Sequence, residues 1–254
     1  MSGIAVDRDL GAPLHHQIYL VLADGIATGR YATGELLPTE EQLGKLFSVS
    51  RITVRRAMAS LQNAGLIERG AGRRTVVKPL GKPLKMPMAS VISNIAAYGA
   101  QTVARVVEFG YGAAPAFLRE RLWEGTGPVQ RAVRVRSQDG QPVMHLTSYV
   151  PGTLGGTFSR AELDRIPMFQ LLQRAGAHIS AGEQIVSATL AEPVVAQRLE
   201  VKVGAALIDL RSMMVDQQGR AVEYVEMLAP PERLSLRFEL GADQLIPVPR
   251  QTTR

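Results

Sequence analysis

Cysteine is absent from the 254-residue chain, so the protein forms no disulfide and binds no metal through thiolates. Aromatic residues make up only 5%, and no apolar run approaches the roughly 18 residues that a membrane-spanning helix needs. The N-terminal segment carries acidic residues without an apolar stretch, unlike a secretory signal. With 46% hydrophobic residues, the sequence predicts a cytoplasmic globular protein of one or two domains without metal or cofactor.

Positive charge is concentrated near the N-terminus. Residues 1–85 hold 12 Lys or Arg against 7 Asp or Glu, whereas the remainder holds 17 against 16. Between Arg51 and Lys78 there are seven basic residues and one acid. A local patch of one sign on an otherwise balanced chain indicates a polyanionic partner, although a merely solvated basic face has the same composition.

The first 65 residues contain the start and stop signals of three helices. An apolar residue at every fourth position from Leu14 to Ile26 predicts a first helix, which Gly29 ends. Thr39 followed by Gln42 has the form of a capping box and predicts the start of a second helix. The third helix follows after the short link SVS and runs to a glycine at position 65.

Two helices joined by three residues, the second of them basic, are typical of a helix-turn-helix. We expect Ser50 to cap this second helix, so that Arg51 and Thr53 lie in its first turn and reach base edges in the major groove. Arg55 lies on the same face, one turn later. The following segment, LIERGAGRRTVV, predicts a two-stranded wing over the DNA backbone or minor groove. The alternative is an ordinary three-helix subdomain with a charged surface.

A linker and a second domain follow. The segment KPLGKPLKMPM packs three prolines and three lysines into eleven residues, which is typical of an extended boundary. Beyond it, alternating runs on either side of DG and of QG predict two hairpins. The helical segments expected here include residues 91–99 and 161–176, and a strand is expected over residues 233–240. We therefore expect an α+β protein with domains at 1–78 and 90–254 and a linker at 79–89.

The first hairpin carries a candidate anion site. Arg134 and Arg136 are two residues apart on a strand, so both guanidinium groups share one face and can converge on one anion. A two-residue turn at Asp139–Gly140 would place His145 opposite Arg134 on that face. His145 is then either a further anion ligand or a packing residue between strands. His178 stands alone and is interpreted as a surface residue.

The segment LPTEEQLGKLFSVSRITVRRAMASLQNAGLIERGAGRRTVV resembles the winged helix-turn-helix of the GntR family of bacterial transcription regulators. The remainder resembles, more loosely, the UTRA effector-binding domain of the HutC subfamily, which has a chorismate-lyase-like fold. The segments that show this resemblance are RVRSQDGQPVMHLTSYVP, DQQGRAVEYVE and RLSLRF. The resemblance implies an N-terminal winged helix-turn-helix followed by a mainly antiparallel-sheet effector domain.

The resemblance also implies site residues. The DNA-contacting set is Thr39, Glu40, Ser50, Arg51, Thr53, Arg55, Arg56, Gly72, Arg73 and Arg74. The effector-binding set is Ser93, Asn94, Arg134, Arg136, His145, Tyr149 and Glu223; Ser93, Asn94 and Tyr149 belong to it by family position alone. In the family, the arginine pair binds a phosphate or carboxylate, and the acid matched by Glu223 contacts polar groups of the effector.

Three residues depart from the family pattern. Arg74 replaces the second glycine of the wing tip, which removes backbone freedom and adds a charge. Leu146 stands where relatives that sense sugar phosphates often carry an acid, and Ala229 lies where many have Tyr-Arg. Both latter changes make the expected pocket more apolar and favour a smaller, less polar anion than an amino-sugar phosphate.

The function implied is that of a homodimeric regulator that places two recognition helices on a pseudo-palindromic operator in double-stranded DNA. A small anionic metabolite would release it, which makes a repressor the expected form. The alternatives are an architectural DNA binder without a ligand and a lyase-like enzyme. No nucleophile elbow, P-loop or cluster of metal ligands supports the enzyme, and the length of the second domain argues against the architectural role.

Overall fold

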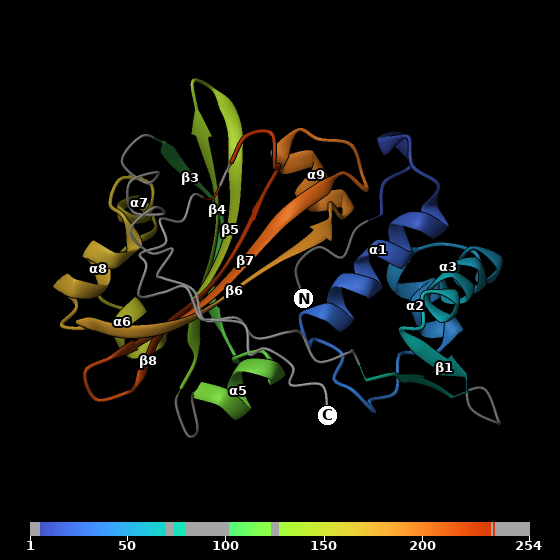
Figure 1. Cartoon of the computed structure of the whole chain (residues 1–254), viewed down its shortest axis with the longest axis horizontal. Coiled ribbons are helices and arrows are strands. Elements are labelled where there is room, and N and C mark those ends of the chain that lie inside the picture. Colours follow the sequence, from blue (N-terminus) through green and yellow to red (C-terminus); the bar gives the residue numbers. More distant parts are fainter. Residues whose placement is uncertain (1–5, 70–73, 80–101, 123–126, 235, 237–254) are drawn as a thin grey trace, which may run out of the picture.

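The fold was analysed in a computed structural model, which describes the chain except for residues 1–5, 70–73, 80–101, 123–126, 235 and 237–254. A small helical domain formed by the N-terminal residues packs beside a twisted six-stranded sheet (Figure 1). The sheet carries helices on both of its faces. This arrangement confirms the predicted α+β fold class, whereas the predicted boundary residues 79–89 lie mostly outside the described part.

The N-terminal domain contains the three predicted helices and the predicted wing. Its elements are η1 (Arg8–Leu10), α1 (Leu14–Ala27), α2 (Glu40–Phe47), α3 (Arg51–Asn63), β1 (Ile67–Arg69) and β2 (Thr75–Val77). β1 and β2 pair antiparallel. The inward residues of all three helices are fully buried in one core, which includes Ile18, Leu22, Leu43, Val54 and Leu61.

Local caps set the geometry of the helix-turn-helix. The Thr39 side chain accepts from the Gln42 backbone N–H, while the Gln42 side chain accepts from the Thr39 N–H, so the capping box is confirmed. Ser48 adopts a left-handed conformation (φ 52°) that ends α2. Ser50 then caps α3 by accepting from the Thr53 N–H at 3.3 Å. The turn between the helices is therefore as short as the sequence predicts.

The second domain is built on one antiparallel sheet in the order β3-β4-β5-β8-β7-β6. Its strands are β3 (Val103–Gly112), β4 (Val129–Gln138), β5 (Gln141–Pro151), β6 (Ile179–Leu190), β7 (Ala206–Asp216) and β8 (Ala221–Ala229). Its helices are α5 (Ala116–Leu122), α6 (Gly152–Gly155), α7 (Arg160–Leu163), α8 (Met168–Arg174) and α9 (Pro193–Leu199). Both predicted hairpins are present, as β4–β5 and β7–β8.

One helix expected in this domain is wrong, and two further expected elements lie mostly or wholly outside the described residues. The single helix expected over residues 161–176 is two short helices, because Pro167 disfavours a helical conformation at the residue before it and begins α8 instead. The strand expected over residues 233–240 falls mostly outside the described residues, and Arg233, Leu234 and Leu236 are not in a strand. The helix expected over residues 91–99 also lies outside the described part.

The β4–β5 hairpin contains the predicted turn but not the predicted register. Asp139 (φ 51°) and Gly140 (φ 80°) both have positive φ, as a tight two-residue turn requires. A β-bulge two residues from the turn then shifts the pairing by one position, so that Arg134 faces Leu146 instead of His145. The one-residue shift places His145 on the opposite face of the sheet from Arg134.

The two faces of the sheet have different neighbours. The front face, defined here as the one that carries Arg134, packs against α7 and α8 through a buried apolar cluster that includes Val106 and Leu163. The back face carries His145 and Arg211 and packs against α9 and the N-terminal domain (Figure 1). Arg211 Nη1 donates to the carbonyl oxygen of Ala27 at 3.0 Å, so the back face contacts the C-terminal end of α1.

Candidate nucleic-acid interface and ligand cavity

The outer face of α3 is exposed and basic. Arg51, Arg55 and Arg56 are exposed, and Ile52 between them has 67% of its surface exposed. The opposite side of the helix is anchored in the core, because Val54, Ala57, Met58 and Leu61 are all buried. The helix is therefore held on one side and presents three cations on the other, as a helix that enters the major groove requires.

The Arg55 side chain extends from α3 to the start of α2. Its Nε is 3.6 Å from Glu40 Oε2 at the start of α2, while two thirds of the Arg55 side chain remains exposed. Thr39 and Ser50 use their hydroxyl groups as helix caps, and Ser50 Oγ also lies 2.8 Å from Thr53 Oγ1. Glu40, Thr39, Ser50 and Thr53 therefore shape the interface, and the free cationic surface comes from the arginines.

The wing is described only in part. Arg74 is exposed and directly precedes β2, the strand that pairs with β1. Gly72 and Arg73, which the sequence assigns to the wing tip, lie outside the described residues. An isolated bridge between Leu36 and Val76 ties β2 to the segment that precedes α2. The position of Arg74 is thus fixed relative to the helix-turn-helix.

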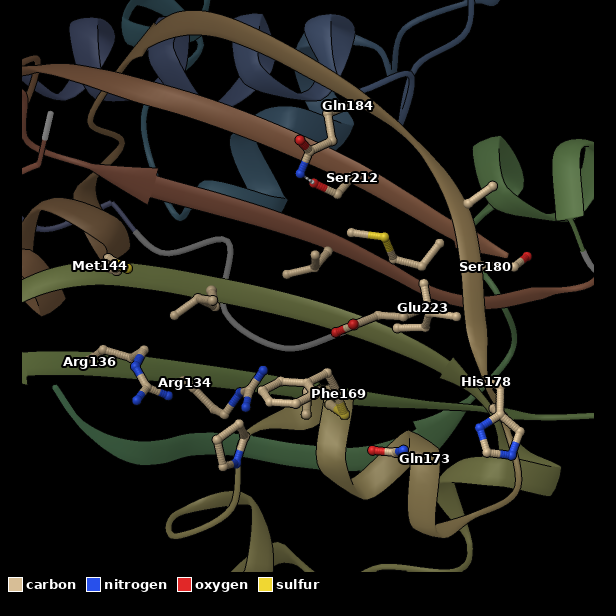
Figure 2. A pocket seen from close by; sticks show the side chains of 18 residues that line it. Arg134, Arg136, Met144, Phe169, Gln173, His178, Ser180, Gln184, Ser212 and Glu223 are labelled. Atoms are coloured by element: carbon tan, nitrogen blue, oxygen red, sulfur yellow. Dashed lines mark hydrogen bonds between the residues drawn. The ribbon is translucent and has the colours of Figure 1, made fainter. Parts of the chain in front are cut away.

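A cavity of about 510 Å³ opens on the front face of the sheet, between β4, β5, β8, β7, β6 and α8 (Figure 2). Its wall is mostly apolar, with Met144, Leu146, Phe169, Met214 and Val225 among the lining residues. The polar lining comes from Arg134, Arg136, Gln173, His178, Ser180, Gln184, Ser212 and Glu223. A concave apolar site with a few convergent polar groups is the usual form of a small-molecule site.

Arg134 is the least satisfied cation of this cavity. Only 3% of its surface is exposed, and its Nη2 donates to Ser148 Oγ at 3.3 Å. The buried Nε has no hydrogen-bond partner among the described residues. Burial lowers the pKa of Arg134, against the opposing influence of the Glu223 and Asp164 carboxylates. A buried guanidinium with an unused donor favours the binding of an anion.

Arg136 and Glu223 flank Arg134. Arg136 is oriented by Thr102, because its Nε donates to Thr102 Oγ1 at 2.7 Å and its Nη2 to the Thr102 carbonyl oxygen at 2.9 Å. Burial and the nearby Arg134 charge both lower the pKa of Arg136. Glu223 is buried, and its carboxylate points into the cavity in Figure 2. Burial raises the pKa of Glu223, while Arg134 and a hydrogen bond with Ser148 act against that rise.

Two residues of the expected effector set lie elsewhere. His145 is on the back face, with its Nε2 at 3.2 Å from Arg198 Nη1, and burial followed by the Arg198 charge lowers its pKa to about 3. Tyr149 is also on the back face, where its hydroxyl accepts from Arg131 Nε at 3.3 Å. The β-bulge places both away from the cavity. Ser93 and Asn94 lie outside the described residues.

Sequence reasoning missed several lining residues, and also Ser148, which contacts Arg134 without being part of the lining. Ser148 follows Leu146 by two positions on β5 and therefore shares its face, a periodicity visible in the sequence once the register is known. Gln184 and Ser212 are cross-strand partners on β6 and β7, and Gln184 Nε2 donates to Ser212 Oγ at 3.1 Å. His178, interpreted as a surface residue, is exposed and lies at the rim of the cavity. No motif in the sequence links these strands.

The described residues contain no group of three or more His, Asp or Glu arranged to hold a metal ion. None of the described helices is long and apolar enough to span a membrane.

Known proteins resemble the chain in both halves. Residues 14–77 match the family described as bacterial regulatory proteins, gntR family, and residues 97–235 match the UTRA domain. The probable fructoselysine utilization operon transcriptional repressor of Escherichia coli K12 is 25% identical over 237 residues, covering 92% of this chain and 98% of that protein. The histidine utilization repressor of Pseudomonas putida is 27% identical over 203 residues, covering 79% and 81%. The structure of the possible transcriptional regulator YydK from Bacillus subtilis has a TM-score of 0.54 at 18% identity, covering 89% and 99%, and so shares the fold.

Proposed function

Since this chain belongs to the bacterial regulatory proteins of the gntR family that carry a UTRA domain, we propose that it is a transcriptional repressor released from DNA by a small anionic metabolite. The family makes it a DNA-binding, effector-responsive transcription regulator. The relatives named above are repressors, which supports repression rather than activation of transcription. We place it in the bacterial cytoplasm as a homodimer, and assign no catalytic step to it.

The proposed DNA contacts come from α3 and the wing. Arg51 and Arg55 would reach base edges or phosphates through their guanidinium groups, because both are exposed on the outer face of the recognition helix. Arg56, Arg73 and Arg74 would contact the phosphate backbone, with Gly72 at the tip of the wing. Thr39, Glu40, Ser50 and Thr53 would hold the helices and Arg55 in position.

The proposed effector binds in the front cavity. Its anionic group would lie against Arg134 and Arg136, and a hydrogen-bond donor would face Glu223. The apolar lining of Met144, Leu146 and Met214 suits a compact hydrocarbon body rather than a highly hydroxylated sugar. Ser93 and Asn94 remain proposed lining residues by family position alone. The buried Nε of Arg134, without a partner among the described residues, is the observation that supports this proposal most.

The ligand experiment is a thermal-shift screen of the full chain against urocanate, short carboxylates, phosphonates and sugar phosphates. A ligand at 100 times its Kd adds about 2.7 kcal/mol to the folded state. We expect a hit that Arg134→Met loses and that Arg220→Met retains, since Arg220 pairs with Asp216 at the β7–β8 turn, outside the cavity lining. An equal response from wild type and Arg134→Met would contradict the site.

The DNA experiment begins with selection of an operator from random double-stranded DNA by the wild-type protein. We expect Arg55→Ala to weaken binding to the selected operator by at least tenfold, the effect of losing a bidentate base contact of about 1–3 kcal/mol. Arg174→Ala serves as the control, because it removes an exposed, ion-paired arginine from the effector domain. Unchanged affinity of Arg55→Ala would show that α3 is not the reading helix.

A further inference from the structure

One apolar side chain is exposed in the middle of the basic face of α3. Ile52 is the second residue of this helix and has 67% of its surface exposed, more than any other large apolar residue in the described part of the N-terminal domain. Val54, two residues later and therefore about 200° further around the helix axis, is fully buried. The core of the domain thus makes no use of Ile52. A β-branched side chain also has a lower helix propensity than an unbranched one, so the helix gains no stability from it.

The neighbours of Ile52 on the helix surface are cations. Residues three and four positions apart meet on one face of a helix, which brings Arg55 and Arg56 next to Ile52, and Arg51 directly precedes it. Ala59, seven positions after Ile52, is exposed on the same face. The face therefore has an apolar centre with guanidinium groups around it. A face that only attracts phosphates needs no apolar residue at its centre.

The start of α3 holds Ile52 in a defined position. The Ser50 side chain caps the helix by accepting from the Thr53 N–H at 3.3 Å, and Ser50 Oγ lies 2.8 Å from Thr53 Oγ1. A β-branched apolar residue in a helix has one strongly preferred χ1 rotamer, so Ile52 loses little conformational entropy when it packs against a partner. In Figure 1, α1 lies between α3 and the effector-domain sheet, so α3 is on the outer side of the molecule.

We propose that Ile52 packs against the C5 methyl group of a thymine in the operator and makes the protein prefer thymine at that base pair. The major groove exposes donors and acceptors of every base pair, and the thymine methyl is its apolar group. The N-terminal residues of a recognition helix are those that reach base edges, and Ile52 lies in the first turn. The proposal rests on the proposed role of α3 as the reading helix, and it adds to that role a residue and the base that this residue selects.

This contact differs from those of the arginines in its dependence on salt. Guanidinium contacts with phosphates release counterions, so they weaken as the salt concentration rises. Contact between two apolar groups releases no counterion. We therefore expect the preference for thymine to stay constant between about 50 and 200 mM salt, while the affinity for the operator falls.

Replacement of thymine by uracil removes only the C5 methyl group and so tests the contact directly. Each thymine of the operator selected from random DNA would be exchanged for deoxyuridine in turn, and binding to the full chain would be measured by fluorescence anisotropy. The proteins compared are the wild type, Ile52→Ala and, as the matched control, Val103→Ala, which truncates an exposed β-branched residue of the effector domain. We expect at least one thymine whose exchange weakens binding by the wild type and by Val103→Ala about fourfold, the effect of burying one methyl-sized group. The same exchange should leave binding by Ile52→Ala unchanged.

A loss that Ile52→Ala retains at every responsive thymine would overturn the proposal, and so would the lack of a loss at any thymine of the operator. A ratio between the thymine and uracil affinities that changes with salt also overturns it. Because Ile52 lies outside the core and Ala is the best helix former, an unchanged circular-dichroism melting curve is expected for Ile52→Ala. Failure of the proposed function has a different result: normal operator binding by Arg55→Ala removes α3 as the reading helix. Weakened binding by Arg55→Ala, without coupling between Ile52 and a thymine, removes the methyl contact alone.

Discussion

The two faces of the effector-domain sheet differ in whether their central arginine forms ion pairs. On the back face, Arg211 lies between carboxylates, with Nη2 at 2.6 Å from Asp209 Oδ2 and Nε at 3.4 Å from Glu226 Oε1. On the front face, Arg134 is more deeply buried than Arg211 but forms no ion pair with the residues that the structure describes. Its contacts are one hydroxyl group and the more distant influence of Glu223 and Asp164.

This difference separates a structural cation, Arg211, from the cation proposed to bind the ligand, Arg134. The Arg211 cluster also joins the domains, because the same guanidinium donates to the Ala27 carbonyl oxygen at the end of α1. Asp24, one turn earlier in α1, is close enough for the Arg211 charge to lower its pKa against the larger effect of burial. A cation that already has its ionic partners within the protein stabilises one arrangement of the molecule. A buried cation in a cavity without such a partner gains one when an anionic ligand binds.

The largest predicted effect is the loss of Arg211. Arg211→Met leaves the buried Asp209 carboxylate without its cation, and we expect a fall of about 3 kcal/mol in the free energy of unfolding. Arg134→Met removes an incompletely paired charge, so we expect a change of less than about 1 kcal/mol in either direction. Urea unfolding followed by circular dichroism would measure both. Equal losses in the two variants would remove the distinction between the faces.

The second prediction uses the two titrating groups of the back face. Burial, and then the Asp24 carboxylate, raise the pKa of Glu226 to about 8, so the folded state keeps a proton that the unfolded chain releases above about pH 4.5. This contribution to stability is full at low pH and is lost as the pH rises to 8. His145, with its pKa lowered to about 3, has the opposite effect on stability. Below about pH 6.5 its imidazole is protonated in the unfolded chain but stays neutral in the folded state, so the free energy of unfolding falls as the pH is lowered.

Above pH 6.5 the Glu226 effect is therefore not offset by His145. Between pH 6.5 and 8 we expect the unfolding free energy of Glu226→Gln to decline less steeply than that of the wild type, by about 1 kcal/mol per pH unit. Buried carboxyl groups away from this cluster, such as Glu223, act with the same sign in both proteins and cancel in the comparison. Urea unfolding at three pH values would give the slopes. Parallel slopes would show that Glu226 is ionised in the folded protein.

The sequence predicted the N-terminal domain more completely than the effector domain, for a physical reason. Its structure depends on local signals, such as the Thr39–Gln42 capping box and the Ser50 cap, which act within four residues. The same locality made the Asp139–Gly140 turn predictable. The cavity, in contrast, combines residues from strands that are far apart in the chain, such as Gln184 and Ser212, and no local rule pairs those strands.

The β-bulge in the first hairpin shows how much one unpredicted residue changes. Its local signal is Pro142, which pairs with Ser137 directly beside the shift in a central strand, and the bulge moves His145 and Tyr149 to the back face. Arg134 and Arg136 still share the front face, because they lie two residues apart on the same strand. Spacing within a strand was therefore a better guide than pairing between strands.

The smallest predicted effect tests this assignment of faces directly. His145→Gln and Tyr149→Phe change side chains that contact Arg198 and Arg131 behind the sheet, so neither alters the lining of the cavity. We expect the Kd of a ligand found in the thermal-shift screen to change by less than twofold in both variants. Tyr149→Phe should cost about 0.5–1 kcal/mol of stability, the worth of one hydrogen bond. Calorimetric titration against Ser148→Ala, which removes the hydroxyl group that contacts Arg134, would provide the contrast. A tenfold loss in His145→Gln without one in Ser148→Ala would place the ligand on the back face.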